Sequence, residues 1–459
     1  MRIIVLGAGQ VGRSLVEHLA GEANDITVVD IDKQRLQMVQ ERFDVKVLCA
    51  PASHPVTLSR AGAEDADMLV AVTNSDEINM IACQVAQSLF NVPRKIARVR
   101  EPGYMEQGKA LFAKVAVPVD VLINPEALVT QHLKKLIRYP GALQVINFAG
   151  GRAQLVALRA LPGGALVGHE ISALRDLLPS VEIRVAAIFR RDRSVVPRGD
   201  TVIEEGDEVF FVAAKSDIRA VMTELRRQEK PYKRIIIAGG GSIGARLAQT
   251  LESDYRVKLI EHDLPRCQWL SQQLQRTTVL HGSASDRELL IEESIEATDV
   301  FLAVTNDDEA NIMASMLAKR MGARTVITLI SNPAYAELVQ GGAIDIAISP
   351  QQATIGALLT HVRKGDVVAV HSLRRGAAEA MEAVAHGDAQ SSQVVGRRLD
   401  ELALPSGTVV GAVVRGENVI IAHDSTVIED GDHLIVFVPD QRDVPAVERL
   451  FQVGLTFLL

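Results

Sequence analysis

The sequence contains an internal duplication that spans most of its 459 residues. A shift of 232 residues places GAGQVG at 7–12 over GGGSIG at 239–244, and TNSDEINM at 73–80 over TNDDEANI at 305–312. A shift of 225 residues aligns DVLINP at 120–125 with DIAISP at 345–350, and TVIEEGDEVFF at 201–211 with TVIEDGDHLIV at 426–436. Because matching segments of this length indicate one structural unit used twice, the chain must fold as two similar halves.

Each half begins with alternating strand and helix patterns. In the first half, short runs rich in Val, Ile and Leu at 2–6, 26–30, 45–48, 68–72, 96–99 and 119–123 predict strands, and helices are predicted from about Gln10, near 33–42 and from Ser75. Such alternation is typical of a doubly wound parallel sheet with right-handed crossovers. A helix starting at Pro125 and ending near Arg138 follows, because proline suits a first helical position.

The rest of each half has a different pattern. Between about 142 and 215, short apolar runs alternate with Gly, Pro and Asp turns, and one helix is predicted near 172–177. The fold class is therefore α/β, with two Rossmann-like doubly wound parallel-sheet domains, each followed by a small α+β lobe. We expect boundaries at 1–124, 125–141 (crossover helix and linker), 142–228, 232–349, 350–365 (crossover helix and linker) and 366–453, with the hydrophilic run 226–230 joining the halves.

A nucleotide site is predicted in each Rossmann-like domain. A glycine fingerprint alone is a weak signal, but here it twice follows a strand, opens a helix and precedes a second strand that ends in an acid. The glycines allow a tight turn, close approach of a pyrophosphate and helix–strand packing, while the acid accepts ribose hydroxyl groups. A carboxylate would repel a 2′-phosphate, so NAD(H) or an unmodified adenine nucleotide is favoured over NADP(H). The candidates are Gly7, Ala8, Gly9, Gln10, Val11, Gly12 and Asp30, and Gly239, Gly240, Gly241, Ser242, Ile243, Gly244 and Glu261. The alternative is a degenerate domain that keeps its glycines only for packing.

Further candidates follow other strands of the two sheets. Thr73, Asn74, Thr305 and Asn306 precede helices at the expected crevice, where they could line the cofactor; Asn74 or Ser75, and Asn306, could instead be helix caps. Asp286 could lie near the adenosine edge in the second copy, and Arg98 could contact phosphate or a neighbouring subunit, or lie on a solvated edge.

Composition excludes several classes of protein. The 49 Lys and Arg residues against 57 Asp and Glu give a net charge of −8, so we expect no nucleic-acid partner. The three cysteines are too few and too scattered for a disulfide framework or a zinc site, and no apolar stretch approaches the roughly 18 residues of a membrane span. No recognisable catalytic motif appears, so we predict neither catalytic nor metal-binding residues.

The motifs carry a resemblance to a known family. The opening MRIIVLGAGQVG, DADMLVAVTNSDEINMIACQVAQSLFN (65–91), TNDDEANIMASMLAKRMGA (305–323), DIAISPQQATIGALLTHVRKGD (345–366) and HGDAQSSQVVG (386–396) resemble the TrkA family, the NAD-binding regulatory subunits of bacterial Trk potassium-uptake systems. The similarity covers essentially the whole chain as an alternating series of RCK-N and RCK-C domains, where RCK stands for regulator of potassium conductance.

The resemblance implies a regulator and not an enzyme. It implies binding of NAD(H), or of ATP or ADP, in the RCK-N domains, and a homotetrameric ring at the cytoplasmic face of the inner membrane, beneath a potassium-conducting subunit of the TrkH or TrkG type. It also implies that the crossover helices, near 125–138 and 350–364, clasp neighbouring lobes. Some ATP-responsive relatives carry Arg inside the glycine loop, where this chain has Gln10 and Ser242. The alternatives are an NAD-dependent oxidoreductase with duplicated Rossmann domains and a cytosolic scaffold with vestigial sites.

Overall fold

A computed structural model describes most of the chain. The described residues are 1–20, 24–112, 116–164, 166–177, 179, 181–191, 193–225, 230–339, 344–362, 366–373 and 378–452. They form two compact units, the first made of residues 1–129 and 350–362 and the second of the rest. Among these residues, no helix is long and apolar enough to cross a membrane. The predicted joining run lies mostly outside the described residues.

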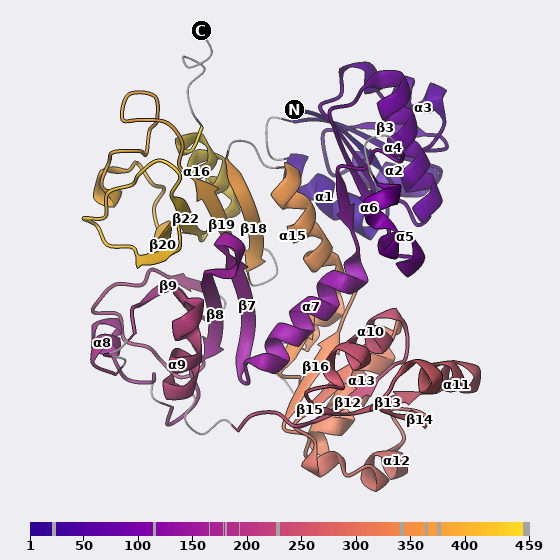
Figure 1. Cartoon of the computed structure of the whole chain (residues 1–459), viewed down its shortest axis with the longest axis vertical. Helices are drawn as coiled ribbons and strands as arrows, with labels where there is room; N and C mark the ends of the chain where they lie inside the picture. Colours follow the sequence, from indigo (N-terminus) through magenta and orange to yellow (C-terminus); the bar gives the residue numbers. More distant parts are fainter. Residues whose placement is uncertain are drawn as a thin grey trace. The chain divides into compact units, whose positions relative to one another are not determined.

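The first unit contains a six-stranded parallel sheet (Figure 1). Its strand order, β3-β2-β1-β4-β5-β6, reverses direction between β1 and β4, which confirms the predicted doubly wound arrangement. Along β1, Ile3 and Val5 face one apolar core and Ile4 and Leu6 face another. Because both faces of the sheet are covered by an apolar core, the strands are apolar on both faces. The elements are β1 (Arg2–Leu6), α1 (Gln10–Ala20), β2 (Asp25–Asp30), α2 (Lys33–Gln40), β3 (Lys46–Cys49), α3 (Pro55–Arg60), η1 (Ala63–Asp65), β4 (Met68–Ala71), α4 (Asp76–Phe90), β5 (Arg94–Arg98), α5 (Pro102–Glu106), α6 (Gly108–Leu111) and β6 (Val121–Ile123).

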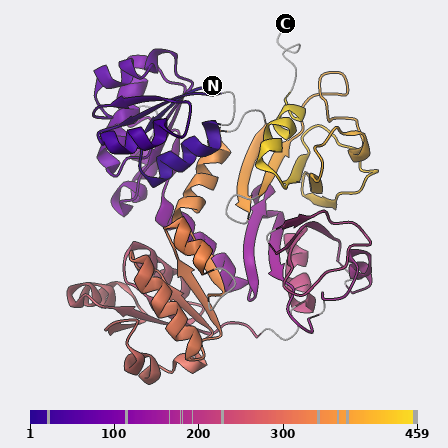
Figure 2. The same cartoon turned by 180° about the vertical axis from the view of Figure 1, so that it is seen from behind.

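A helix from the second half of the sequence completes this unit. Helix α15 (Pro350–Val362) packs along α1, and Figure 2 shows the orange helix against the indigo domain. Ile355, Leu358 and Leu359 enter the same apolar core as Leu15 of α1 and Val5 of β1. The first Rossmann-like domain therefore buries one of its faces partly with chain from the second copy. The last residues predicted for this helix, 363 and 364, lie outside the described residues.

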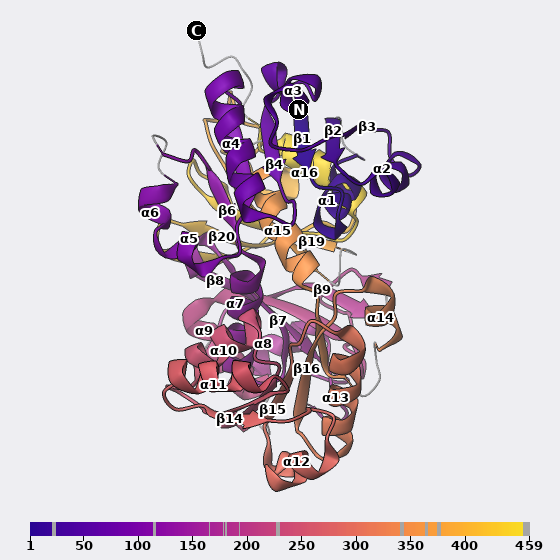
Figure 3. The same cartoon turned by 90° about the vertical axis from the view of Figure 1, so that its right-hand side faces the viewer.

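The second unit repeats the parallel sheet. Its order, β14-β13-β12-β15-β16-β17, is that of the first sheet, and Figure 3 shows helices on both of its faces. The elements are β12 (Arg234–Ala238), α10 (Ser242–Leu251), β13 (Arg256–Glu261), α11 (Leu264–Gln273), β14 (Thr278–His281), α12 (Arg287–Glu292), η4 (Ile295–Ala297), β15 (Val300–Ala303), α13 (Asp308–Arg320), β16 (Thr325–Leu329), α14 (Pro333–Leu338) and β17 (Ile346–Ile348). Helix α7 (Pro125–Arg138), whose bounds match the prediction, runs from the first unit into the second.

Two small antiparallel lobes complete the second unit. Their strand orders, β10-β9-β11-β8-β7 and β21-β20-β22-β19-β18, are the same topology, so the duplication extends to the lobes. The lobes share one apolar core, in which Phe189 packs edge-to-face on Phe210 and on Phe437. The elements are β7 (Ala142–Phe148), η2 (Ala149–Gly151), β8 (Ala153–Arg159), η3 (Ile171–Ala173), α8 (Leu174–Leu177), β9 (Ile183–Arg190), β10 (Arg193–Val195), β11 (Glu208–Ala214), α9 (Lys215–Leu225), β18 (Val367–Leu373), β19 (Ala378–Val384), η6 (Leu399–Glu401), β20 (Val409–Arg415), β21 (Asn418–Ile421), β22 (His433–Val438), η7 (Gln441–Asp443) and α16 (Val444–Leu450).

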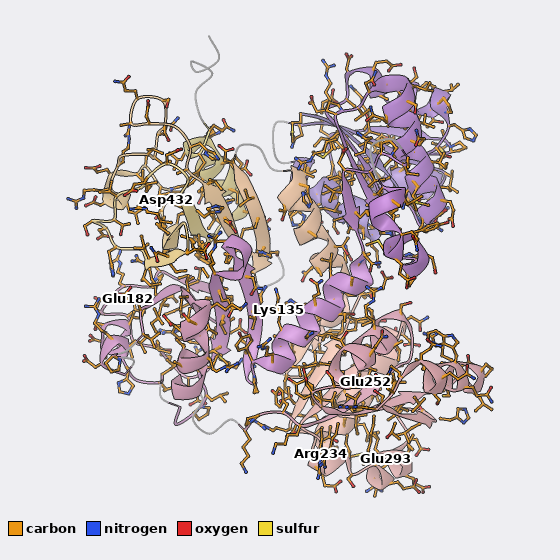
Figure 4. The ribbon with its side chains drawn as sticks, viewed as in Figure 1. Lys135, Glu182, Arg234, Glu252, Glu293 and Asp432 are labelled. Carbon is orange, nitrogen blue, oxygen red and sulfur yellow. The ribbon has the colours of Figure 1, made fainter. Side chains whose placement is uncertain are left out.

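The repeated Glu-x-Gly-Asp sequence holds each lobe together with a buried ion pair. Arg190 donates through Nε and Nη2 to the two carboxylate oxygens of Asp207, at 2.9 and 2.8 Å. Arg415 binds Asp432, which is labelled in Figure 4, in the same way, at 2.8 and 2.8 Å. Both aspartates are almost completely buried, at 1% and 0% exposed. A planar guanidinium that binds a carboxylate with two parallel bonds fixes the strand to the turn.

Candidate nucleotide-binding sites

The glycine loops have the backbone geometry that the fingerprint predicts. Gly7 and Gly239 have φ angles of +108° and +107°, which side chains rarely allow. A Cβ atom at Gly12 would lie 1.9 Å from the carbonyl oxygen of Gly7, and one at Gly244 would lie 1.9 Å from that of Gly239. These four positions thus require glycine for the turn and for close packing of the helix on the loop. This requirement belongs to the fold and would hold with or without a ligand.

The middle glycines leave open space instead. A Cβ at Gly241 would have no heavy atom within 4 Å, and one at Gly9 would have only a guanidinium nitrogen of Arg35, at 3.9 Å. Gly241 is also the N-cap of α10, and it offers no side-chain oxygen to the first-turn N–H groups. Free N–H groups at a helix N-terminus with open space before them suit a phosphate. Gln10 and Val11 begin α1, and Ser242 and Ile243 begin α10, at these same positions.

Asp30 ends β2 directly beside the first glycine loop. Its Oδ2 accepts a hydrogen bond from the backbone N–H of Ala8 at 2.6 Å, and its Oδ1 accepts one from that of Asp32 at 2.9 Å. The side chain is half-buried. The structure therefore brings the acid and the loop together, as the sequence predicts, and leaves the acid accessible.

Glu261 occupies the same position in the second copy but is buried, with 7% of its surface exposed. Its Oε2 accepts from the N–H of Gly240 at 2.7 Å, and its Oε1 accepts from the N–H groups of His262 and Asp263 at 2.8 and 2.9 Å. Burial by itself would raise the pKa of this carboxyl group, but these backbone donors and His262 outweigh it, so the pKa is lowered. Glu261 is therefore an ionised carboxylate tied into the loop.

A cavity lies at the carboxyl end of the second sheet. Its walls include three predicted site residues, Gly239, Glu261 and Thr305. The remaining wall, which the sequence reasoning missed, consists of Ala238, Ile260, His262, Gly282, Ser283, Ala284, Ser285, Ala310, Asn311 and Ala314. The cavity opens at the point where the strand order reverses, which is where doubly wound sheets bind ligands.

Two buried asparagines position the threonines of the T-N motifs. The Oδ1 of Asn79 accepts from the backbone N–H and the hydroxyl of Thr73, at 3.0 and 2.7 Å. Asn311 does the same for Thr305, at 2.9 and 2.7 Å. Both asparagines are fully buried. The sequence reasoning missed them, although an Asn six residues after the Thr in both copies was a signal that could have found them.

The helix caps after these threonines differ from the predictions in one case. In the first copy, Ser75 is the N-cap of α4, and its hydroxyl accepts from Ile78 N–H at 3.2 Å, so Asn74 is not the cap. In the second copy, the prediction for Asn306 is wrong, because Asp307 is the N-cap and accepts from Ala310 N–H at 2.8 Å. A cap residue needs extended backbone angles one position before the helix, which Asp307 has.

Asp286 caps a helix, and Arg98 ends a strand in partly buried surroundings. The carboxylate of Asp286 caps α12 by accepting from Glu288 N–H at 2.9 Å, and Asp286 is not among the cavity-lining residues given above. Arg98 ends β5 and is half-buried, and burial followed by the charge of Arg100 lowers its pKa. Among the described residues, its Nε has no hydrogen-bond partner. Arg98 thus lies in partly buried surroundings and not on the solvated edge that was one prediction.

Comparisons with known proteins agree with this architecture. The model of the TrkA-N domain matches residues 3–125 and 235–350, and the model of the TrkA-C domain matches 155–226 and 389–452. The Trk system potassium uptake protein TrkA of Halomonas elongata is 64% identical, and that of Vibrio alginolyticus 58%, each over 100% of both chains. The relatives are thus named for potassium uptake, which favours a regulatory role over an oxidoreductase.

Solved structures show the same fold at low sequence identity. The crystal structure of the GsuK RCK domain matches with a TM-score of 0.62 and 18% identity, covering 98% of this chain and 94% of that chain. The GsuK channel bound to NAD matches with a TM-score of 0.61 and 17% identity, covering 98% of this chain and 78% of that chain. Two copies of each domain model and full-length relatives, one of them 64% identical, show that this chain belongs to the TrkA family.

Proposed function

We propose that this chain is the nucleotide-sensing regulatory subunit of a Trk-type potassium uptake system. The observation that carries the proposal is the pair of complete glycine loops, each with its acid in place, in a chain of the TrkA family. Each loop leaves helix N–H groups and open space for a pyrophosphate, and each acid lies where an adenosine ribose would be bound. The ligands we propose are NAD(H), or ATP or ADP.

Helix α15 gives the first site a route to the rest of the chain. The Nε2 of Gln351 donates to the carbonyl oxygen of Gln10 in the glycine loop at 3.2 Å and also binds the hydroxyl of Ser14. Helix α15 directly precedes the second lobe in the sequence. A ligand that changes the first turn of α1 would therefore act on a helix that leads into another domain. Such coupling requires that the ligand bind two states with different affinity.

The energy demand on each site is small. Moving a gate from 1:99 to 99:1 takes about 5.5 kcal/mol, so four equivalent sites would each need to contribute about 1.4 kcal/mol. We propose that four chains form a ring at the cytoplasmic face of the membrane and act on a potassium-conducting subunit of the TrkH or TrkG type. The full-length likeness to Trk system potassium uptake proteins supports this partner.

Potassium uptake in a Trk-regulator-deficient bacterium tests the proposal. The double variant Gly9→Asp with Asp30→Ala places a carboxylate in the phosphate space and removes the ribose acceptor. We expect weaker binding of NADH and ADP by the purified protein, and uptake that no longer follows nucleotide supply. Asp25→Ala is the matched control, because Asp25 starts the same strand β2 at its other end and makes an exposed ion pair with Lys46. Unchanged binding and uptake in the double variant would refute the proposal.

A further inference from the structure

The two acids differ in how many hydrogen bonds they can still accept. An ionised carboxylate only accepts, and its two oxygens offer about four acceptor positions. A ribose presents two neighbouring hydroxyl groups, so recognition of both by one carboxylate needs two free acceptor positions. The number of positions already used within the protein therefore decides how much of the ribose each acid can recognise.

Asp30 keeps about half of its acceptor capacity. Its two oxygens each accept one backbone N–H, from Ala8 at 2.6 Å and from Asp32 at 2.9 Å. Each oxygen therefore has one position left. The next residue, Ile31, is 75% exposed and has no side-chain donor that could occupy those positions. The first site thus presents a half-buried carboxylate able to accept from two hydroxyl groups at once.

Glu261 has used most of its capacity within the protein. Three backbone N–H groups donate to it, from Gly240, His262 and Asp263. Oε1 receives two of these donors and Oε2 receives one, which leaves a single free position, on Oε2. The Glu261 side chain is only 8% exposed, whereas that of His262 is 86% exposed.

We propose that the two nucleotide sites read the ribose differently, because Glu261 already accepts one more backbone N–H than Asp30 does. The first site, through Asp30, requires both the 2′- and the 3′-hydroxyl. The second site, through Glu261, recognises at most one of them and tolerates deoxyribose at the other. This inference rests on the proposed nucleotide binding, and it adds which groups of the ligand each site selects.

Chains with a single intact site make the difference measurable. Gly241→Asp leaves only the first site, and Gly9→Asp leaves only the second; neither change meets backbone, because the added Cβ has no backbone atom within 4 Å. Each full-length variant is titrated calorimetrically with ADP, 2′-deoxy-ADP and 3′-deoxy-ADP. In the Gly241→Asp chain, we expect both deoxy nucleotides to bind about tenfold more weakly than ADP, since each loses a hydrogen bond to a charged group. In the Gly9→Asp chain, we expect a loss for at most one of them.

The outcomes separate this inference from the proposed function. If ADP binds neither single-site chain, nucleotide binding itself fails and the inference falls with it. If ADP binds both chains and both deoxy nucleotides are equally penalised in each, the nucleotide-binding proposal stands and the inference is overturned. A penalty for both deoxy nucleotides at the first site, with a penalty for at most one of them at the second site, would support it.

Discussion

In each copy, a lysine pairs with an equivalent aspartate, but the lysine comes from a strand in the first copy and from a helix in the second. The two pairs differ in burial, so together they test how burial affects the cost of removing the lysine. In the first copy, Nζ of Lys95 on β5 lies 3.0 Å from Oδ2 of Asp120 and donates to Val92 O at 2.9 Å. In the second copy, Nζ of Lys319 on α13 lies 2.7 Å from Oδ2 of Asp345. The Lys95 side chain is 2% exposed and that of Asp120 31%, whereas the Lys319 and Asp345 side chains are 31% and 37% exposed.

The expected cost of Lys→Met follows from these exposures. Removing one partner of a buried ion pair costs about 3–5 kcal/mol, because the other charge stays buried without compensation. Asp120 retains some contact with water and its hydrogen bond from Lys95 N–H at 2.7 Å, so we expect Lys95→Met to cost roughly 2–3 kcal/mol. Lys319→Met opens a pair that water already screens, so about 1 kcal/mol or less is expected.

A single unfolding free energy is not defined for a chain of several domains. Hydrogen exchange measured by mass spectrometry can instead measure the local loss of stability in each of the two variants. Peptides from β5 and β6 should lose protection by about 30- to 160-fold in Lys95→Met, with β16 and β17 as the unchanged internal reference. In Lys319→Met, β16 and β17 should lose at most about fivefold, and β5 and β6 should be unchanged. Equal losses in the two variants would refute the argument that burial decides the cost.

Three further substitutions test other parts of the fold. Gly244→Ala places a Cβ 1.9 Å from the carbonyl oxygen of Gly239, so the second parallel-sheet domain should not fold, and a wild-type thermal unfolding curve would contradict this. Asp432→Asn removes the charge from a fully buried group that binds Arg415, so hydrogen exchange of peptides from β20 and β22 should show a loss of protection worth about 2–4 kcal/mol; a change below about 0.5 kcal/mol would be inconsistent with it. Burial lowers the pKa of His371 from 6.5 to about 4, so the unfolded state binds this proton first and stability falls as the pH drops from 6.5 towards 4. His371→Gln should make that fall shallower in circular dichroism, and an identical slope would speak against it.

Much of the local structure could be predicted from sequence. The helix predicted from Pro125 to near Arg138 has those bounds, because proline fixes its first turn and an apolar stripe continues to its end. The strand β1 was predicted to the residue, since its sequence is apolar and buried on both faces from Ile3 to Leu6. Helix α3 was not predicted. Its six residues, from Pro55 to Arg60, are too short to show a helical period.

Side-chain partners at the sites were less predictable. The cap of α13 was assigned to Asn306 and not Asp307, since both residue types favour N-caps and only the backbone angles distinguish them. Lys95 and Lys319 neutralise equivalent aspartates from a strand and from a helix, and no repeat offset relates them. Such pairs depend on which side chains meet in space.

The sequence by itself determined the two glycine loops, their acids, the duplicated sheets and the family, because these depend on periodicity, on glycine backbone freedom and on matching segments along the chain. Only the tertiary structure decided that α15 packs on α1 of the first copy, because an apolar helix face does not specify which sheet covers it. Only the tertiary structure, likewise, revealed that three backbone N–H groups donate to Glu261 whereas two donate to Asp30. Hydrogen-bond capacity is shared out only once the donors are brought together in space.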